Sequence, residues 1–399
     1  MQSEIKVLKK DVTLYEKGQK VDKLYFIKDG IIEIEINDEI KKQDSGSVGE
    51  WALLKIPAVE TVRALKGAKI VSVSPENLLK MKEYGKLLLK IFKSITFRLN
   101  FVDEIISPNI SPGNAMETFS NIYKGYTFRE NDFILHYRIM KKYYRENKLE
   151  DAAKELEKID VRKLDLDMHD ELEIWKSILK YKLNPQFGKE YLHRVYSKDS
   201  KKRLSYNYFE TLVNKENNAF YDLYGKYGLH VPKKTVLIVE GDRAKDIGYL
   251  LLKGGVKVAR FSEGEENILA VILNGEFFGE ATLFNERKRQ ATVFSDKPFD
   301  VIEFSKETLS ETFEKSPEFG LKLIQNQLKR IVNTLKMDSI LKLDPYNRIN
   351  ELFNNFYTRF INANMTINEL SRFANVKISD VIDVTLKRNM KIDPEGHIK

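Results

Sequence analysis

The chain has 399 residues and a net charge of +8, with 42% hydrophobic and 32% charged residues. This composition is typical of globular proteins, and the length predicts two or three domains. Because the chain contains no cysteine, disulfides, thiolate catalysis and cysteine-ligated metal sites are excluded. The five histidines are scattered and form no metal-spaced pair, so we expect no metal site.

The sequence also argues against a membrane protein and an enzyme. Residues 1–10 are charged and lack the apolar core of a signal peptide, and no run approaches the roughly 18 apolar residues of a membrane span. We therefore expect a cytoplasmic protein with no membrane partner. No nucleophile–base set, metal cluster or Walker-type loop is evident, so we expect no catalytic residues and no cofactor.

Residues 1–107 have the pattern of a β-rich domain that ends in a helix. Apolar and acidic residues alternate over residues 31–36, which is the period of a half-buried strand. A helical pattern follows over residues 75–107, with enough apolar residues to pack on the sheet and on a partner helix. The proline-containing stretch 107–114 predicts a linker.

Residues 113–216 are predicted to be entirely helical. Apolar residues recur at helical spacing over residues 133–145, 149–159 and 170–183. The phrase Tyr144–Ala153 resembles a tetratricopeptide-like helical hairpin, which implies one or two such hairpins. An all-helical spacer with an ordinary core is an equally good interpretation.

Residues 217–342 repeat the plan of the first segment. Gly30 aligns with Gly254 and Gly49 with Gly279 in two series of short strands. We therefore predict an internal duplication of one β-roll.

The second copy contains a stretch suited to binding a cyclic phosphate, residues 279–293. Gly279 tolerates positive φ and lets the backbone approach a ligand, and Glu280 can accept hydrogen bonds from a ribose hydroxyl. Arg289 carries a planar fork of donors that matches a phosphate. The polar run 285–288 could cap a small helix that points backbone N–H groups at an anion.

This stretch, in which Gly-Glu is followed by Arg-x-Ala-Thr-Val and preceded by Gly-x-Phe-Phe, resembles the phosphate-binding cassette of the cyclic nucleotide-binding domain. That domain occurs in regulators of the catabolite activator/FNR type, in protein kinase A regulatory subunits and in gated channels. The resemblance implies that the ligand contacts are Gly279, Glu280, Ala281, Arg289, Gln290 and Ala291. Gln290 stands where the family often has a small residue, so cyclic AMP, cyclic GMP, a cyclic dinucleotide and no ligand all remain open.

The first copy departs from the cassette pattern. It keeps Gly49 and Glu50, but alignment places Ala58 where the phosphate-binding arginine would stand. Without a positioned cation an anionic phosphate loses its main charged partner. We therefore predict that the first roll is structural, or binds something other than a cyclic nucleotide.

A long helix is predicted to follow the second roll. Pro317 suits a first helical turn, and apolar residues then step by three and four along residues 318–341. The resemblance implies that this helix forms a homodimer with its mate and contacts the nucleotide base through Asn333 and Thr334. Pairing of the two rolls within one chain is an alternative.

Residues 343–399 resemble the hinge and winged helix-turn-helix of the same regulators. Thr366 and Glu369 predict a capped helix and Asn375 a left-handed turn before a recognition helix over residues 379–389. The DNA contacts implied by this arrangement are Lys377, Ser379, Lys387 and Arg388. Asp380 and Asp383, three residues apart, would repel phosphates from that helix.

Together these patterns predict an α+β multidomain protein. It would contain two double-stranded β-helix (jelly-roll-like) domains, an all-α middle segment and a C-terminal winged helix-turn-helix, over residues 1–107, 113–216, 217–342 and 343–399. The predicted function is a ligand-responsive transcription regulator, with a cyclic nucleotide-like molecule, double-stranded DNA and a second copy of the chain as partners. The alternative is a nucleotide-sensing or scaffolding protein that no longer binds DNA.

Overall fold

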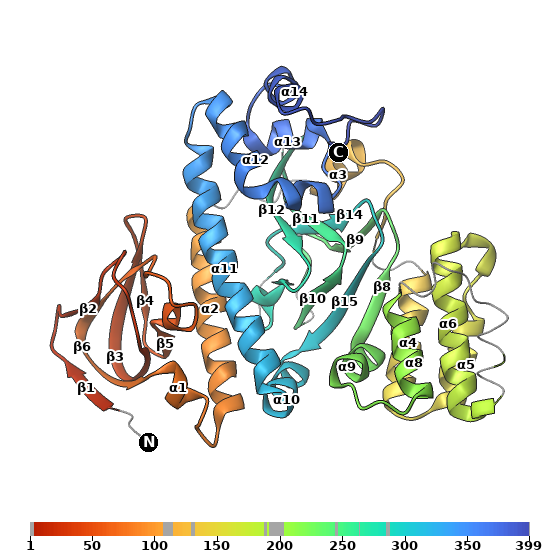
Figure 1. Ribbon diagram of the computed structural model, residues 1–399, viewed down its shortest axis with the longest axis horizontal. Coiled ribbons are helices and arrows are strands. Elements are labelled where there is room, and N and C mark those ends of the chain that lie inside the picture. Colours follow the sequence, from red (N-terminus) through yellow and green to blue (C-terminus); the bar gives the residue numbers. More distant parts are fainter. Residues whose placement is uncertain are drawn as a thin grey trace.

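The computed structural model describes residues 4–106, 115–128, 132–186, 190, 203–243, 246–262, 264–284 and 288–398. The predicted linker 107–114 and most of the polar run 285–288 therefore lie outside the described residues, as does Lys399. Figure 1 shows a β-rich unit at the left, a second β-rich unit at the centre, helices at the right and the C-terminal helices at the top.

Residues 4–106, called the N-terminal unit, form one six-stranded sheet that is followed by helices. The order is β1-β6-β3-β4, with β2 paired to β6 and β5 to β3. Ile32, Ile34 and Ile36 are buried and alternate with more exposed residues, as the sequence pattern predicts. The elements are β1 (Glu4–Leu8), β2 (Thr13–Tyr15), β3 (Leu24–Ile36), β4 (Glu39–Gln43), β5 (Gly46–Val48), η1 (Glu50–Leu53), β6 (Thr61–Val73), α1 (Pro75–Leu78) and α2 (Tyr84–Ile106).

A helical segment follows and packs around Trp175, which is fully buried. The rings of Tyr137, Tyr144 and Tyr208 surround this indole at 5.5–6.0 Å. The elements are α3 (Ala115–Ile122), β7 (Thr127–Phe128), α4 (Asp132–Arg145), α5 (Leu149–Glu157), η2 (Val161–Lys163), α6 (Leu166–Leu183), α8 (Leu204–Val213) and α9 (Ala219–Tyr227). Because α9 is helical, the second β-rich unit begins at residue 228 and not at residue 217 as predicted.

The second β-rich unit, called the two-sheet unit, has sheets ordered β13-β10-β15-β8 and β12-β11-β14-β9-β7. Helices α10 (Lys306–Lys315) and α11 (Pro317–Leu341) follow, and Pro317 occupies the first turn as predicted. The remaining elements are β8 (Gly228–Val231), β9 (Thr235–Ile238), β10 (Ile247–Lys253), β11 (Gly255–Ser262), β12 (Glu265–Leu273), β13 (Phe277–Phe278), η4 (Glu280–Thr282), β14 (Thr292–Ser295) and β15 (Phe299–Ser305).

His230 joins the helical segment to the two-sheet unit. Its Nε2 lies 2.7 Å from Asp167 of α6 and its Nδ1 lies 2.8 Å from Asp300 of β15. Burial opposes a charge on the imidazole, but the two carboxylates outweigh burial and raise the pKa of His230 to about 10. The junction therefore contains a charged, doubly paired histidine at neutral pH.

The two β-rich units share a local backbone feature. Gly49 has φ 81° and precedes η1, and Gly279 has φ 70° and precedes η4. In both units a left-handed glycine therefore turns the chain into a short 3-10 helix that begins with a buried glutamate. Duplication of the whole roll stays a prediction.

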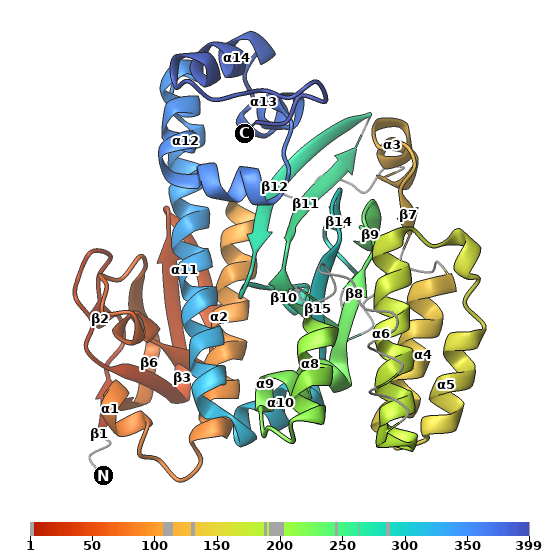
Figure 2. The same ribbon diagram turned by 45° about the vertical axis from the view of Figure 1, so that its right-hand side comes forward.

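Helices α2 and α11 pack side by side, as Figures 1 and 2 show. Of the residues in the predicted seam of α11, Ile324, Leu328 and Ile331 are fully buried, whereas Leu321 and Leu335 are half-buried. A homodimer through residues 318–341 would need this face, but α2 of the same chain covers it. The structure thus pairs the two β-rich units within one chain, and the homodimer stays a prediction.

Aromatic packing extends this contact into the two-sheet unit. The ring of Phe92 on α2 lies 5.4 Å from that of Phe277, 6.3 Å from that of Phe284 and 5.7 Å from that of Phe313. All of these ring pairs adopt the edge-to-face geometry that aromatic pairs prefer. Helix α2 therefore completes the core of a unit that it precedes by more than 100 residues.

The C-terminal helices are α12 (Pro345–Asn362), α13 (Ile367–Ala374) and α14 (Ile378–Lys387). Thr366 and Glu369 form the predicted capping box, and Asn375 is left-handed with φ 49°. These helices dock on β11 and β12 through a core that includes Phe261, Phe294 and Phe356. In the described ranges, no helix is both long and apolar enough to span a bilayer.

Gln327, a buried residue in the middle of helix α11, generates a prediction. It is fully buried, and neither amide atom bonds to any described residue. An unmet buried polar group costs about 1–3 kcal/mol, and leucine has a similar volume. Gln327→Leu should therefore raise the melting temperature by several degrees in a thermal unfolding scan.

Gln325→Leu is the matched control, because Gln325 is half-buried on the same helix and donates a 3.1 Å hydrogen bond to the carbonyl of Leu53. This control should not be stabilised. An unchanged or lowered melting temperature for Gln327→Leu would contradict the prediction.

Candidate functional site

The candidate site begins at the turn between β13 and η4. Gly279 is required there because its φ is positive and because a Cβ atom would lie 3.0 Å from Nη1 of Arg289 and 3.1 Å from Ile238. The turn leads the chain inward, so that Glu280 is only 3% exposed. The glycine thus places a carboxylate inside the two-sheet unit.

Glu280 is attached to the long helix α11. Its Oε1 accepts a 2.9 Å hydrogen bond from Nη1 of Arg330, which also donates to the carbonyl of Phe277 at 2.8 Å. The other oxygen, Oε2, is buried and receives no hydrogen bond from any described residue. The carboxylate therefore keeps one acceptor for a hydroxyl or N–H donor.

Arg330 extends this pair to α2. Its Nη2 lies 3.9 Å from a carboxylate oxygen of Asp103 near the end of that helix. Burial opposes the guanidinium charge, but Glu280 and Asp103 outweigh burial and raise the pKa of Arg330. Glu280, Arg330 and Asp103 thus connect the cassette, α11 and α2 through one chain of charges.

Sequence reasoning missed Arg330. The resemblance implied Asn333 and Thr334 as the ligand contacts on α11, and the two cations before them, Lys329 and Arg330, were left unassigned. The available signal was a cation within an otherwise apolar helix seam, since a buried cation needs an acidic partner. The partner itself, 50 residues away, was not visible in the sequence.

Arg289 lies beside Gly279, as the motif predicts, but its donors bind protein acceptors. Nη1 donates to the carbonyl of Gly279 at 2.9 Å and to Oγ1 of Thr282 at 2.6 Å, and Nη2 donates to the carbonyl of Ile247 at 2.7 Å. The side chain is 5% exposed. It lines a cavity of about 150 Å³, together with Arg138, Lys141, Arg145 and Glu303 among others.

The other predicted contacts of the cassette are close by. The carbonyl of Gln290 accepts a 3.0 Å hydrogen bond from Nε of Arg260. Ala281 and Ala291 are half-buried on either side of the loop. Asn285, Glu286 and Arg287 lie outside the described residues, so the predicted anion-binding helix there stays a prediction.

Asn333 and Thr334 line a different cavity from Arg289. This cavity lies between β12, α11 and α12, and its volume of about 30 Å³ suits water rather than a nucleotide base. Phe356, Arg359 and Phe360 of α12 form its other wall. The space beside the predicted base-contacting residues is thus largely filled by α12.

Comparisons with known proteins find similarity over the two-sheet unit. Residues 229–316 match the family described as "Cyclic nucleotide-binding domain". This part of the chain is therefore similar to cyclic nucleotide-binding domains.

Several relatives are regulators. The cAMP-activated global transcriptional regulator CRP of Pasteurella multocida is 34% identical over 121 residues, which cover 30% of this chain and 57% of that protein. CRP of Salmonella typhimurium is 31% identical over the same length and coverage. The cAMP-dependent protein kinase regulatory subunit of Yarrowia lipolytica is 36% identical over 73 residues, 18% of this chain and 19% of that protein. The match thus spans a little over half of each CRP.

Similar solved structures include the c-di-GMP responsive global regulator CLP of Xanthomonas campestris, with a TM-score of 0.36, 21% identity and coverage of 43% of this chain and 92% of that one. A cAMP-bound PfPKA-R structure covers 87% of this chain and 83% of its own, with a TM-score of 0.24 and 15% identity.

In the N-terminal unit the corresponding position is filled by an ion cluster. Arg98 of α2 lies 2.5 Å from Glu50 and 3.1 Å from Glu60, and all three side chains are fully buried. Glu60 also accepts hydrogen bonds from Tyr15 and Trp51. Burial opposes the charge of Arg98, but the two glutamates outweigh burial and raise its pKa. The cation absent at Ala58 is thus supplied by the unit's own helix, which gives a physical basis for the prediction that the first roll is structural or binds something other than a cyclic nucleotide.

The predicted DNA-contacting residues differ in their exposure and in their hydrogen bonds. Lys377, Ser379 and Lys387 are exposed at α14, which lies at the top of the molecule in Figures 1 and 2. Arg388 instead donates to Asn350 at 2.9 Å and Asn354 at 2.8 Å, which anchors it to α12.

The two aspartates of α14 also differ. Asp380 accepts a 3.2 Å hydrogen bond from the N–H of Lys377, so it caps the helix. Asp383 is exposed.

One group of metal-type ligands appears in the described part of the chain. Asp393, Glu395 and His397 place their ligand atoms within 4.8 Å of one another. His397 lies 3.2 Å from Asp393 and 3.6 Å from Glu395, so the imidazole and the carboxylates already pair with one another. The group is best described as a set of hydrogen bonds between His397 and Asp393 that closes the C-terminal turn.

The ion cluster of the N-terminal unit generates a prediction. Arg98→Met would leave Glu50 and Glu60 buried without a cation, and breaking such a cluster from one side costs roughly 3–5 kcal/mol. Thermal unfolding of the variant should begin many degrees below that of the unchanged protein.

Arg63→Met is the control, because Arg63 also pairs with glutamates of this unit but is 37% exposed. This substitution should lower the free energy of unfolding by less than about 1 kcal/mol. Adding Glu50→Gln and Glu60→Gln to Arg98→Met should recover part of the stability. Equal melting temperatures for Arg98→Met and Arg63→Met would contradict the prediction.

Proposed function

We propose that this protein is a ligand-responsive transcription regulator. Its effector is a cyclic nucleotide or a related cyclic phosphate that binds in the cyclic nucleotide-binding domain, and its C-terminal helices bind double-stranded DNA. The observation that carries the proposal is the buried carboxylate of Glu280, which has one oxygen held by Arg330 and the other without a donor among the described residues. A ribose hydroxyl is a donor of the right kind for that oxygen.

Arg289 is the proposed partner of the effector's phosphate. Its guanidinium now donates to the carbonyls of Gly279 and Ile247 and to Thr282. A phosphate would replace these neutral acceptors with charged ones, and charge-assisted hydrogen bonds are about twice as strong. The side chain therefore gains interaction energy when an anion enters, without needing a new position far from the cassette.

The proposed signal passes along α11. An effector that contacts Glu280 changes the strength of the ion pair between Glu280 and Arg330 of α11. Helix α11 is followed by Asp344, which is the N-cap of α12, and then by α13 and α14. The effector favours the DNA-binding arrangement only to the extent that it binds that arrangement more tightly. Because α12 fills the space beside Asn333 and Thr334, movement of α12 is the step that we propose the effector controls.

DNA binding is assigned to α13 and α14 as a helix-turn-helix. The left-handed Asn375 forms the turn, and Lys377, Ser379 and Lys387 are exposed on or beside the second helix. Each chain contains one such unit. A dimer through α11 would bring a second unit, but α2 of the same chain already packs against that helix. We therefore propose that a single chain reads one half-site rather than a palindrome.

The second candidate is a nucleotide-sensing or scaffolding protein without DNA binding. Arg388 is anchored to α12, and Asp383 places a carboxylate on the exposed side of α14. The docking of α13 on the two-sheet unit through Arg372 and Glu266, 2.6 Å apart, also suits a purely structural role for these helices.

Calorimetric titration with cyclic AMP, cyclic GMP and cyclic di-GMP tests the effector site. We expect saturable binding of one of them, and a loss of at least tenfold to a hundredfold in affinity for Arg289→Leu, since a hydrogen bond to a charged group contributes about 1.5–3 kcal/mol. Lys297→Leu, which removes an exposed cation of the same domain, should bind normally. Retained binding in Arg289→Leu would place the site elsewhere.

Titration of DNA fragments with and without the effector, over a range of salt, separates the two candidates. The regulator should bind more tightly with effector, and its affinity should fall with salt. Lys387→Glu should weaken binding and reduce the salt slope by about one, because each neutralised phosphate contributes about 0.9. Equal affinity with and without effector would contradict the regulator, and an absence of salt-dependent DNA binding would favour the scaffold.

A further inference from the structure

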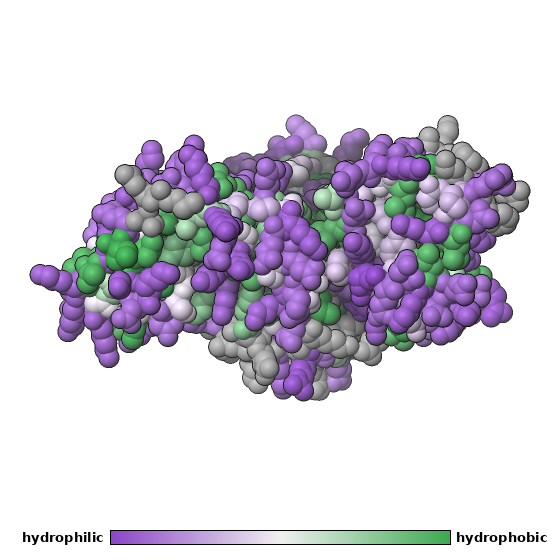
Figure 3. Space-filling model, turned by 90° about the horizontal axis from the view of Figure 1, so that it is seen from below, coloured by the Kyte–Doolittle hydropathy of each residue, from purple (hydrophilic) through white to green (hydrophobic). Residues whose placement is uncertain are grey.

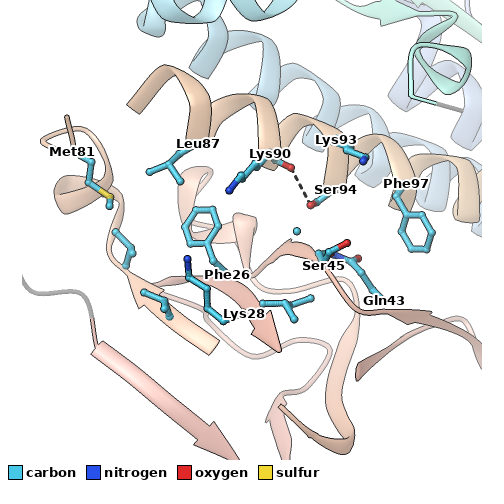
Figure 4. Close-up of a pocket in the computed structure, with 14 residues that line it drawn as sticks. Phe26, Lys28, Gln43, Ser45, Met81, Leu87, Lys90, Lys93, Ser94 and Phe97 are labelled. Atoms are coloured by element: carbon cyan, nitrogen blue, oxygen red, sulfur yellow. Dashed lines mark hydrogen bonds between the residues drawn. The ribbon is translucent and has the colours of Figure 1, made fainter. Parts of the chain in front are cut away.

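We propose that the N-terminal unit holds a second ligand site, which binds an amphipathic carboxylate such as a medium-chain fatty acid. The site is a cavity of about 390 Å³ between the sheet and α2 (Figure 4). Its size falls in the range of about 300–1,000 Å³ that is typical of small-molecule sites. This inference does not depend on the proposed function of the cyclic nucleotide-binding domain.

The cavity is distinct from the degenerate cassette. Its walls come from β3, β6, the turn between β4 and β5, the connection after α1, and α2. Gly49, Glu50 and Ala58 do not line it, and the ion cluster around Arg98 closes the cassette itself. In the N-terminal unit the ion cluster thus fills the cassette, and the cavity lies on the other side of the turn that ends in Gly46.

The cavity wall is mainly apolar. Phe26, Val71 and Val73 contribute from the sheet and Leu87 and Phe97 from α2. Phe26 and Val73 are buried and the other three are half-buried, so the wall combines core residues with side chains that a ligand can reach. A hydrocarbon chain that contacts these residues is removed from water.

The strand register extends this apolar floor onto the surface. Val71 lies opposite Phe26 on one side and opposite Ile5 on the other, so the three side chains form a row on one face of the sheet. Ile5 is 61% exposed, and Val7, two residues along the same face of β1, is 76% exposed. Figure 3 shows apolar side chains gathered over this unit, at the left of the view. A chain longer than the cavity would thus still meet apolar surface.

Three lysines supply the charge. Lys28, Lys90 and Lys93 line the cavity and are exposed, and none forms an ion pair with a described residue. No acidic residue lines the cavity. In Figure 4 the amino groups of Lys28 and Lys90 lie near the ring of Phe26, whereas that of Lys93 points away. Two unpaired cations beside an apolar wall favour a ligand with one anionic head and a hydrocarbon tail.

Gln43 shows that the wall is not a finished core. It is 8% exposed, and its Nε2 donates a 2.6 Å hydrogen bond to the carbonyl of Ser45. Its Oε1 is buried and receives no hydrogen bond from any described residue. A buried acceptor of this kind is costly unless a water or a ligand supplies a donor. A water can supply that donor, whereas a carboxylate only accepts hydrogen bonds, so the ligand's head group belongs beside the lysines and not beside Gln43.

The test is calorimetric titration of the full chain with hexanoate, octanoate and decanoate, each below its micelle concentration, and with decanol as the uncharged probe. We expect the dissociation constant to fall about fourfold for each added methylene, the factor that corresponds to about 0.8 kcal/mol per buried CH₂. Decanol should bind at least tenfold more weakly than decanoate.

Variants assign the binding to this cavity. Lys28→Glu combined with Lys90→Glu should lower the affinity for decanoate at least tenfold and leave the affinity for decanol unchanged. Lys66→Glu, which reverses an exposed lysine of the same unit that does not line the cavity, should have no such effect. Leu87→Gln should lower the affinity for decanoate more than the affinity for hexanoate.

Three results would overturn the proposal: no saturable binding of decanoate, equal binding of decanol and decanoate, or normal binding in the lysine double variant. The outcome is separable from that of the effector site. Arg289→Leu should bind decanoate normally, and the lysine double variant should bind cyclic nucleotides as the unchanged protein does.

Discussion

The packing of α2 against α11 is the contact on which the rest of the structure depends. It buries the apolar seam of α11 without a second chain and joins two β-rich units that are separated in sequence by the whole helical segment. Phe92 then enters the core of the two-sheet unit, and Asp103 approaches Arg330, the residue that holds Glu280. The environment of the two-sheet unit is thus partly built by the N-terminal unit, whose own cassette is closed.

The same electrostatic solution occurs in both units with different results. In each, an arginine of the long helix neutralises the glutamate that follows the left-handed glycine: Arg98 for Glu50 and Arg330 for Glu280. The first arrangement adds a second carboxylate, Glu60, whose Oε1 also accepts hydrogen bonds from Tyr15 and Trp51, so one guanidinium faces two carboxylates. The second arrangement contains Arg289 and Asp103 in addition, so two guanidinium groups face two carboxylates. The first cluster therefore carries a net negative charge that opposes an anion, whereas the second is neutral overall.

Local sequence patterns predicted local structure well. The alternation over residues 31–36, the proline at the start of α11 and the capping box of Thr366 and Glu369 all depend on neighbours within a few positions, and the structure contains each of them. The partners of buried charges could not be predicted, because Arg330 and Glu280, or Lys257 and Glu369, meet only when distant segments fold together. For the same reason the contact of α11 with α2 and the hydrogen bonds of Arg388 to Asn350 and Asn354 could not be predicted from the sequence. Spacing reveals which face a residue occupies, but not what covers that face.

Lys257 sets the cost of moving the C-terminal helices. Its side chain is fully buried and pairs with Asp296 of its own unit and with Glu369, the residue that also caps α13. Burial opposes the ammonium charge, but the two carboxylates outweigh burial and raise the pKa of Lys257. Separating α13 from β11 would remove one of these carboxylates, and a buried charge that loses a partner is strongly destabilised. Any rearrangement of these helices must therefore either keep the Lys257–Glu369 contact as a pivot or expose Lys257 to water, and the retained Asp296 makes the second route less costly than it would be for a singly paired lysine.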